Sequence, residues 1–139
     1  MDERVTIHAS TVAIGDRAVM ILGASGAGKS DLALRLIDRG ARLVSDDYTV
    51  LTVADGTLTA SAPTTIAGRI EVRGVGIVPC PHVDNVPVAL AVRVDAAPDR
   101  LPVTRHETFA GVAVRCVALD PHHASTPIAV ELALRHDLP

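Results

Sequence analysis

Hydrophobic and polar residues alternate in short runs along most of the chain, and this pattern predicts a fold dominated by β-strands. The runs are rich in Val, Ile and Thr, which fit the pleated surface of a sheet, and turn-forming residues separate them. We expect strands at residues 5–8, 11–14, 18–22, 42–45, 49–53, 57–61, 88–94 and 111–118. Gly15-Asp16 and Ala54-Asp55-Gly56 are expected to form tight hairpin turns between neighbouring strands.

Two segments have the spacing of a helix instead. In residues 29–39 a hydrophobic stripe runs along one face, and Asp31 and Arg35 stand four positions apart on another face. Gly40 follows, and a glycine in the left-handed conformation commonly ends a helix. The stripe is formed by Leu32, Ala33, Leu36 and Ile37. Residues 127–135 resemble a closing helix that begins at a proline.

Residues 69–77 break this regularity, because glycines surround charged residues there. We expect a loop with short extended pieces that is not part of the core. Loops of this kind often carry function. Prolines at positions 79, 81 and 87 then interrupt the chain before the next expected strand.

The segment between strand 18–22 and helix 29–39 is a complete G-x-x-x-x-G-K-[ST] phosphate-binding motif. Its residues are Gly23, Ala24, Ser25, Gly26, Ala27, Gly28, Lys29 and Ser30. Lys29 is the only lysine in a chain with 13 Lys and Arg residues. In this setting backbone N–H groups and the helix N-terminus face the phosphates, the ammonium reaches the β- and γ-phosphates, and the Ser30 hydroxyl is a ligand for Mg²⁺. We therefore predict nucleotide or polyphosphate binding.

Composition limits the classes of function. The chain has 139 residues, 48% of them hydrophobic, which is enough for a single domain at residues 1–139 with its own core. Tyr48 and Phe109 are the only aromatic residues, so a stacking platform for bases is not expected. A net charge of −3 with no basic patch also argues against a nucleic-acid partner.

The sequence carries no membrane or export signal that we recognise. No run approaches the roughly 18 apolar residues of a membrane span, and residues 1–4 lack the features of a signal peptide. We expect a cytoplasmic protein that does not bind a membrane. Cys80 and Cys116 are then expected to be free thiols at buried or half-buried positions.

Phosphoryl transfer requires a carboxylate near the metal and a base near the attacking oxygen. Asp46 and Asp47 follow strand 42–45, which we expect a crossover to return to the sheet beside the phosphate strand. Adjacent residues of a strand point to opposite sides, so one carboxylate would approach the phosphate and metal while the other holds a neighbour. Two alternatives stay open: the pair is a solvated acidic turn, or Asp95 at the end of strand 88–94 binds the metal.

Other polar residues are ambiguous. Glu71, in the charged segment 69–74, is either a solvated surface residue or a functional one. His8 is either a hydrogen-bonded structural residue or part of the site. A zinc site is not expected, because zinc-binding pairs have a different spacing from that of Cys80, His82, His122 and His123.

The order and spacing of these segments resemble the catalytic domain of the HPr kinase/phosphorylase family, bacterial enzymes that phosphorylate a serine of the small phosphocarrier protein HPr. The resemblance covers residues 5–78: His8 precedes Gly23 by 15 positions, RLVSDD follows the helix, and RIEVRGVGI resembles the signature segment of the family. It implies an α/β fold of the P-loop kinase type, strand-rich, with a phosphate-loop helix and a C-terminal helix. The resemblance is to the short form of the family, which lacks the N-terminal domain of long members.

The resemblance also implies ATP and Mg²⁺ as cofactors, and a role for each site residue. Asp46 would be the general base toward the serine hydroxyl, and the general acid in the reverse direction. Asp47, His8 and Glu71 would organise the site, and Lys29 would neutralise the charge that develops during transfer. The implied ligands of Mg²⁺ are Ser30, Glu71 and Asp47.

Long family members carry a phosphate-binding motif with Arg where this chain has the Arg-free segment 120–126. The reverse reaction, a phosphorolysis by inorganic phosphate, should suffer most from this difference, unless Arg69, Arg73 or Arg115 substitutes. The resemblance implies a hexamer as well. Two other functions stay open: a small-molecule kinase, disfavoured because no Arg-rich lid is present, and a nucleotide-binding regulatory protein without transfer activity.

Overall fold

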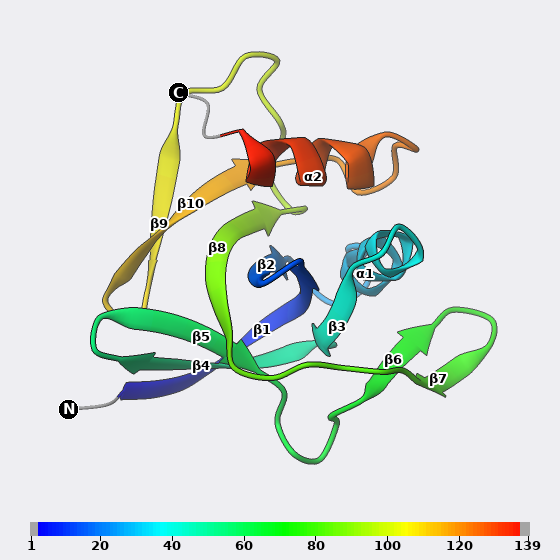
Figure 1. Ribbon diagram of the computed structural model, residues 1–139. Coiled ribbons are helices and arrows are strands. Elements are labelled where there is room, and N and C mark those ends of the chain that lie inside the picture. Colours follow the sequence, from blue (N-terminus) through cyan, green and yellow to red (C-terminus); the bar gives the residue numbers. More distant parts are fainter. Residues whose placement is uncertain (1–2, 137–139) are drawn as a thin grey trace.

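The computed structural model describes residues 3–136 (Figure 1), so residues 1, 2 and 137–139, at the ends of the expected domain, lie outside the described residues. The first strands and the first helix are β1 (Glu3–Ile14), β2 (Arg17–Leu22), α1 (Lys29–Asp38), β3 (Arg42–Ser45), β4 (Tyr48–Ala54) and β5 (Thr57–Ser61). The remaining elements are β6 (Arg69–Val72), β7 (Gly76–Pro79), β8 (Val86–Arg93), β9 (Arg105–Phe109), β10 (Val112–Ala118) and α2 (Thr126–Arg135). Neither helix of this part of the chain is long and apolar enough to span a membrane.

The main sheet is curved because two of its strands take part in both of its halves. Its order is β2-β1-β4-β5-β8-β10-β9, with β3 paired to β1 and with an additional pairing between β2 and β8. The first half of β1 pairs with β4, and its second half pairs with β2 and β3. Likewise, β8 pairs with β5 at its start and with β2 and β10 further along. Figure 1 shows the bend of β8 and both helices beside one part of the sheet.

Local sequence explains the turns that connect these elements. Ala54 pairs with Thr57 across Asp55 and Gly56, whose φ angles are 53° and 76°. Positive φ at both central residues is the geometry of the tight hairpin turn for which Asp-Gly is favoured. The predicted helix 29–39 is confirmed as α1, and Gly40 with φ 109° follows it.

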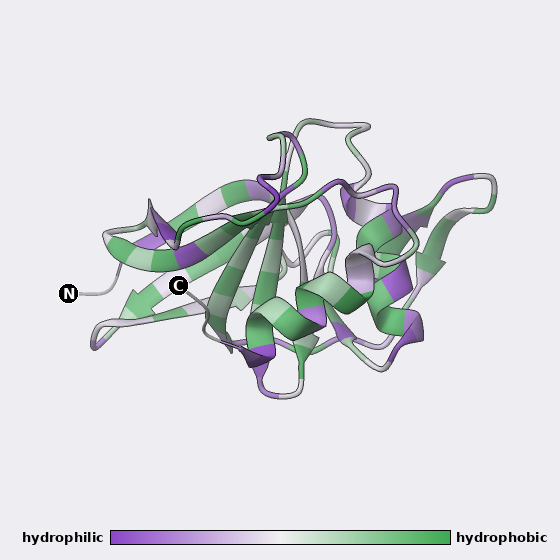
Figure 2. Cartoon of the chain, turned by 90° about the horizontal axis from the view of Figure 1, so that it is seen from above, coloured by the Kyte–Doolittle hydropathy of each residue, from purple (hydrophilic) through white to green (hydrophobic). Residues whose placement is uncertain are grey.

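Alternate residues of the central strands enter two separate cores, as the period of a strand requires. Ala13 and Met20 face a core that the two halves of the sheet enclose. Val12 and Ile21 face the opposite core, against the buried stripe of α1 and Val130 of α2. Figure 2 shows hydrophobic positions concentrated on the strands.

Three strand predictions were wrong. The segments predicted at 5–8 and 11–14 are one continuous strand, β1, because Ala9 and Ser10 between them pair with β2 like the residues that follow. Strand β9 was not predicted, and it pairs with β10. Pro87 was expected to break the chain but lies inside β8, opposite Thr59. It is the second residue of that strand, near the end where a missing N–H is best tolerated.

The prediction that residues 69–77 stand outside the core was also wrong. The short extended pieces are confirmed as the two-stranded hairpin β6–β7. However, Ile70 is only 2% exposed and packs in the core beside α1. The exposed charged residues Arg69 and Glu71 stand on either side of this buried side chain, which explains why the sequence of the segment suggests a polar loop.

The position expected for β3 was wrong as well. β3 does not lie beside the phosphate strand β2, because β1 pairs with β2 on one edge and with β3 on the other. Both pairings are antiparallel, so β2 and β3 still run in the same direction. The residues after each of them therefore meet at the same edge of the sheet.

Candidate active site

The phosphate-binding motif forms the loop between β2 and α1. Gly26 and Gly28 have φ angles of 83° and 105°, which residues with a Cβ atom rarely adopt. Lys29 is buried, and its Nζ atom donates to the carbonyl oxygens of Gly23 and Ala24 at 2.8 and 3.1 Å. The loop therefore curls around its own ammonium group.

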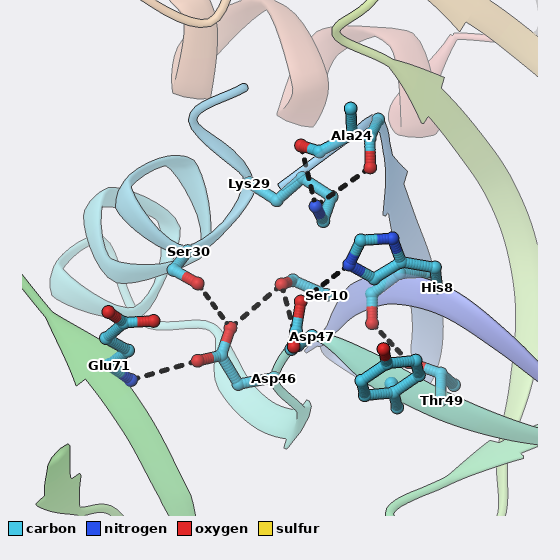
Figure 3. Close-up of polar contacts among 12 residues, drawn as sticks. His8, Ser10, Ala24, Lys29, Ser30, Asp46, Asp47, Thr49 and Glu71 are labelled. Carbon is cyan, nitrogen blue, oxygen red and sulfur yellow. Dashed lines mark hydrogen bonds and ion pairs between the residues drawn. The ribbon is translucent and has the colours of Figure 1, made fainter. Parts of the chain in front are cut away.

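Asp46 is buried at the end of β3 and accepts three hydrogen bonds (Figure 3). Its Oδ1 atom accepts from Ser10 Oγ at 2.8 Å and from Ser30 Oγ at 2.6 Å. Its Oδ2 atom accepts from the backbone N–H of Glu71 at 2.9 Å. Asp46 thus joins β1, the phosphate loop and the hairpin β6–β7 at one point.

Asp47 has a different environment, although it is the next residue. Its Oδ1 atom lies 2.7 Å from Nε2 of His8, and its side chain is 50% exposed. The ring of Tyr48 stacks on His8 with a centroid distance of 5.1 Å, and the Asp47 N–H donates to Ser10 Oγ. Within residues 3–136, Oδ2 of Asp47 has no hydrogen-bond partner.

A cavity of about 600 Å³ lies over these groups. Its polar lining comes from the phosphate loop, the end of β3, the hairpin β6–β7 and the segment before α2, and includes Lys29, Ser30, Asp47, Glu71, Arg73 and His122. Asp46 does not line it, because its oxygens are turned to Ser10, Ser30 and the Glu71 amide. The two adjacent aspartates therefore point to different surroundings, as expected for consecutive residues at a strand end.

Several other candidates lie away from this cavity. Asp95 follows β8 and lies next to Gly23, the first residue of the phosphate loop, with its carboxylate 3.5 Å from Arg93. His82 is nearest to Asp84, and His123 to Asp120. Among residues 3–136 no group of three or more His, Cys, Asp or Glu residues could hold a metal ion.

The two cysteines are half-buried free thiols, as expected. Burial raises the pKa of the Cys80 thiol. Burial also raises the pKa of Cys116 to about 11, and the neighbouring Glu107 adds to that increase. Both thiols are therefore poor nucleophiles at neutral pH.

Of the three arginines named as alternatives to the missing motif, Arg73 lines the cavity. Arg115 does not, because its guanidinium donates to the carbonyl oxygens of Ala133 and His136 at the end of α2. Arg69 begins β6 and is exposed.

Sequence reasoning missed Ser10, which contacts both aspartates. A signal existed, since residues two apart in a strand share a face and Ser10 stands two residues after His8. The predicted break between 5–8 and 11–14 concealed it. His122 was considered only as a zinc ligand, although the resemblance places a phosphate-binding motif of long family members at segment 120–126.

Comparison with known proteins agrees with this geometry. Residues 1–84 match the family described as HPr Serine kinase C-terminal domain. HPr kinase/phosphorylase of Clostridium botulinum strain Eklund 17B is 44% identical over 72 residues, which are 52% of this chain and 24% of that protein. The enzyme of the same name from Clostridium tetani is 36% identical over 97 residues, which are 67% of this chain and 32% of that protein.

The match therefore spans only about a quarter to a third of the length of these curated relatives. A solved structure agrees over a much larger share of the fold. The HPr(Ser) kinase/phosphatase from Coxiella burnetii superposes with a TM-score of 0.81 at 29% sequence identity, and the superposition covers 94% of both chains. Because the family match covers more than half of the sequence and includes the phosphate loop, both aspartates and the hairpin β6–β7, this chain belongs to the HPr serine kinase C-terminal domain family.

Proposed function

We propose that this chain is an ATP- and Mg²⁺-dependent kinase that transfers the γ-phosphoryl group to a serine of HPr or of a closely related phosphocarrier protein. The observation that carries the proposal is the hydrogen bond between Ser30 and Asp46 at 2.6 Å. It joins the phosphate loop to the pair of aspartates, so that a bound triphosphate and a potential base share one cavity. The relatives named above supply the substrate, because their names identify them as HPr kinases.

The hydrogen bonds of Lys29 support the proposed nucleotide binding. Its ammonium now donates to two carbonyl oxygens of its own loop. Phosphate oxygens carry charge and are stronger acceptors than carbonyls, so a triphosphate competes for the same donor. The curled loop and the N-terminus of α1 add backbone N–H groups and the positive end of the helix dipole.

The donor set beside the loop fits Mg²⁺, which prefers hard oxygen ligands and usually takes one or two carboxylates together with phosphates and water. Ser30 and Glu71 line the cavity, and Asp46 holds the Ser30 hydroxyl. We assign the metal to the Ser30 hydroxyl and to the carboxylate of Glu71, with Asp46 as the group that orients Ser30. When bound there, Mg²⁺ would neutralise charge on the phosphates.

For the base, the geometry favours Asp47 over Asp46, the residue expected from the resemblance. Both oxygens of Asp46 accept hydrogen bonds, whereas Asp47 lines the cavity with one oxygen beside His8 and the other without a partner among residues 3–136. We therefore propose that the serine Oγ attacks the γ-phosphorus in line while its proton passes to Asp47. The bond from that phosphorus to the ADP oxygen breaks, and ADP leaves.

The decisive experiment incubates the protein with γ-labelled ATP, Mg²⁺ and purified HPr, and follows the label. Label on an HPr serine is the expected result, and a Ser→Ala variant of HPr should remain unlabelled. Slow release of free phosphate, with none on HPr, would favour a nucleotide-binding regulatory protein instead. A pulse with labelled phospho-HPr and inorganic phosphate tests the reverse reaction, and sedimentation tests the hexamer that the resemblance implies.

A further inference from the structure

His122 lines the cavity but has no role in the mechanism proposed above. It belongs to the segment 120–126 between β10 and α2, far from the phosphate loop in sequence. Pro121 of this segment is buried and packs against the phosphate loop. A Cβ atom placed on Gly28 would lie 3.3 Å from the Pro121 ring and 3.6 Å from Cε1 of His122. The imidazole is therefore a neighbour of the loop glycine that precedes Lys29.

Two sets of contacts hold the segment in this position. Arg35 of α1 donates to the carbonyl oxygens of Pro121 and His123, and it also pairs with Asp31 at 3.1 Å. Inside the segment, the backbone N–H of His122 donates to Asp120 Oδ1 at 2.9 Å, and Thr126 Oγ1 donates to the Asp120 carbonyl. The backbone around His122 is thus fixed from the helix side and from within.

Among the described residues the ring of His122 has no partner, in contrast to the ring of its neighbour His123. Over residues 3–136 the structure gives the His122 ring no hydrogen bond and no ion pair. His123 instead pairs with Asp120 at 3.5 Å, is 71% exposed and does not line the cavity. An imidazole has at least one N–H donor at any pH at which it is neutral, and two when it is protonated. Here a donor on an anchored segment faces a cavity whose floor is a phosphate-binding loop.

We propose that His122 is a phosphate-binding residue, whose ring N–H donates to a non-bridging oxygen of the phosphate chain of the bound nucleotide. This inference rests on the proposed nucleotide binding, and it adds a donor from outside the G-x-x-x-x-G-K-[ST] motif. The ligand class is a nucleoside di- or triphosphate with its magnesium ion. The affinity for adenosine, which carries no phosphate group, should not depend on His122.

The test compares His122→Ala with His123→Ala, a matched control in the same segment, by calorimetry with Mg-ATP and Mg-ADP. His122→Ala should weaken binding about tenfold, the effect of one hydrogen bond to a charged group, whereas His123→Ala should bind like the wild type. His122→Arg, which keeps a cationic donor, should recover most of the affinity. Thermal unfolding of all variants confirms that each is folded.

A second readout follows the ring itself. The Cε1–H resonance of His122, identified by its loss in His122→Ala, should shift on addition of Mg-ATP and remain unchanged with adenosine. Three outcomes would each overturn this inference and leave the proposed function untouched. They are equal affinity of His122→Ala and wild type, an unshifted resonance, and failure of His122→Arg to recover affinity. Wild-type protein that binds no Mg-ATP would overturn it together with the proposed function. If His122→Ala weakens binding but no label reaches HPr, the kinase assignment falls and the inference stands.

Discussion

The backbone N–H of Glu71 donates a 2.9 Å hydrogen bond to Asp46 Oδ2, which ties the hairpin β6–β7 to the end of β3. The preceding residue, Ile70, is buried beside α1. The hairpin is thus held by one apolar contact and one polar contact on adjacent residues. Its charged side chains reach the cavity from that fixed base.

Replacing Ile70 by Ala should therefore affect both stability and activity. Loss of a buried Ile side chain leaves a cavity and should lower the free energy of unfolding by about 2–5 kcal/mol. Transfer to HPr should fall as well, because Glu71 loses its fixed position. Ile77→Ala is the matched control, since Ile77 lies on the same hairpin and is 71% exposed. Urea unfolding and the labelling assay measure the two effects; equal losses in both variants would contradict this account of the hairpin.

Asp46 and Asp47 should differ in their contribution to stability. Asp46→Asn removes a charged acceptor from three donors, one of them a backbone N–H that would face an amide, so unfolding should become easier by about 1–3 kcal/mol. Asp47→Asn loses only a half-exposed pair with His8, and a change below about 1 kcal/mol is expected. Chemical denaturation of both variants at pH 7 measures the difference. A larger loss in Asp47→Asn would refute the burial argument.

The parts of the fold that local signals determine could be predicted. The hairpin turn at Asp55-Gly56, the helix α1 and the closing helix α2 each have a turn, a period or a cap that their own residues determine. The insertion of β1 between β2 and β3 could not be predicted in this way, since strand order depends on which long-range pairs form. Strand β9 lacks a strong hydrophobic alternation, and it exists because β10 offers it an edge.

The same distinction between local and long-range signals applies to the candidate site. Residues of the phosphate loop were predicted from a contiguous motif, and the structure places Asp47, His8 and Glu71 around it. The different environments of the two aspartates could not be predicted, because they depend on Ser10 and on the Glu71 amide, which come from distant segments.

The pair of Arg93 and Glu107 should make stability depend on pH. Hydrogen bonds from Arg93 hold the pKa of Glu107 below its ordinary value of 4.5, so the folded state binds this proton less readily than the unfolded state. The contribution is present above pH 4.5 and is lost as the pH falls through the lower folded-state value. Glu107→Gln should lower stability at pH 7 by no more than about 1 kcal/mol, because the pair is partly exposed.

Thermal unfolding of wild type and Glu107→Gln between pH 7 and pH 3 measures this effect. The two unfolding temperatures should converge toward the acid end, because protonated Glu107 resembles Gln. Curves that stay parallel over the whole range would show that the pair does not titrate as described. Asp99→Asn is the control, since Asp99 meets Arg105 on the exposed surface at 3.4 Å.

Lys29→Ala should reduce the affinity for Mg-ATP by about a hundredfold, because several charge-assisted contacts to phosphate are lost together. Lys29→Arg should bind poorly too, since a planar guanidinium is larger than the compact ammonium that donates to the Gly23 and Ala24 carbonyls. Calorimetry with Mg-ATP gives both affinities. Wild-type affinity in Lys29→Ala would remove the basis for nucleotide binding at this loop.

Asp47→Asn and Asp46→Asn should separate the two proposed roles in catalysis. Loss of a general base slows transfer by about 10²–10⁴-fold, so Asp47→Asn should bind Mg-ATP normally yet label HPr at a greatly reduced rate. Asp46→Asn releases the Ser30 hydroxyl and should first weaken Mg-ATP binding, with a higher Mg²⁺ requirement. Single-turnover labelling at saturating Mg-ATP distinguishes binding from transfer. If Asp47→Asn transfers at a near-normal rate while saturated Asp46→Asn does not, the proton goes to Asp46, and the arrangement around Asp47 serves only to position His8.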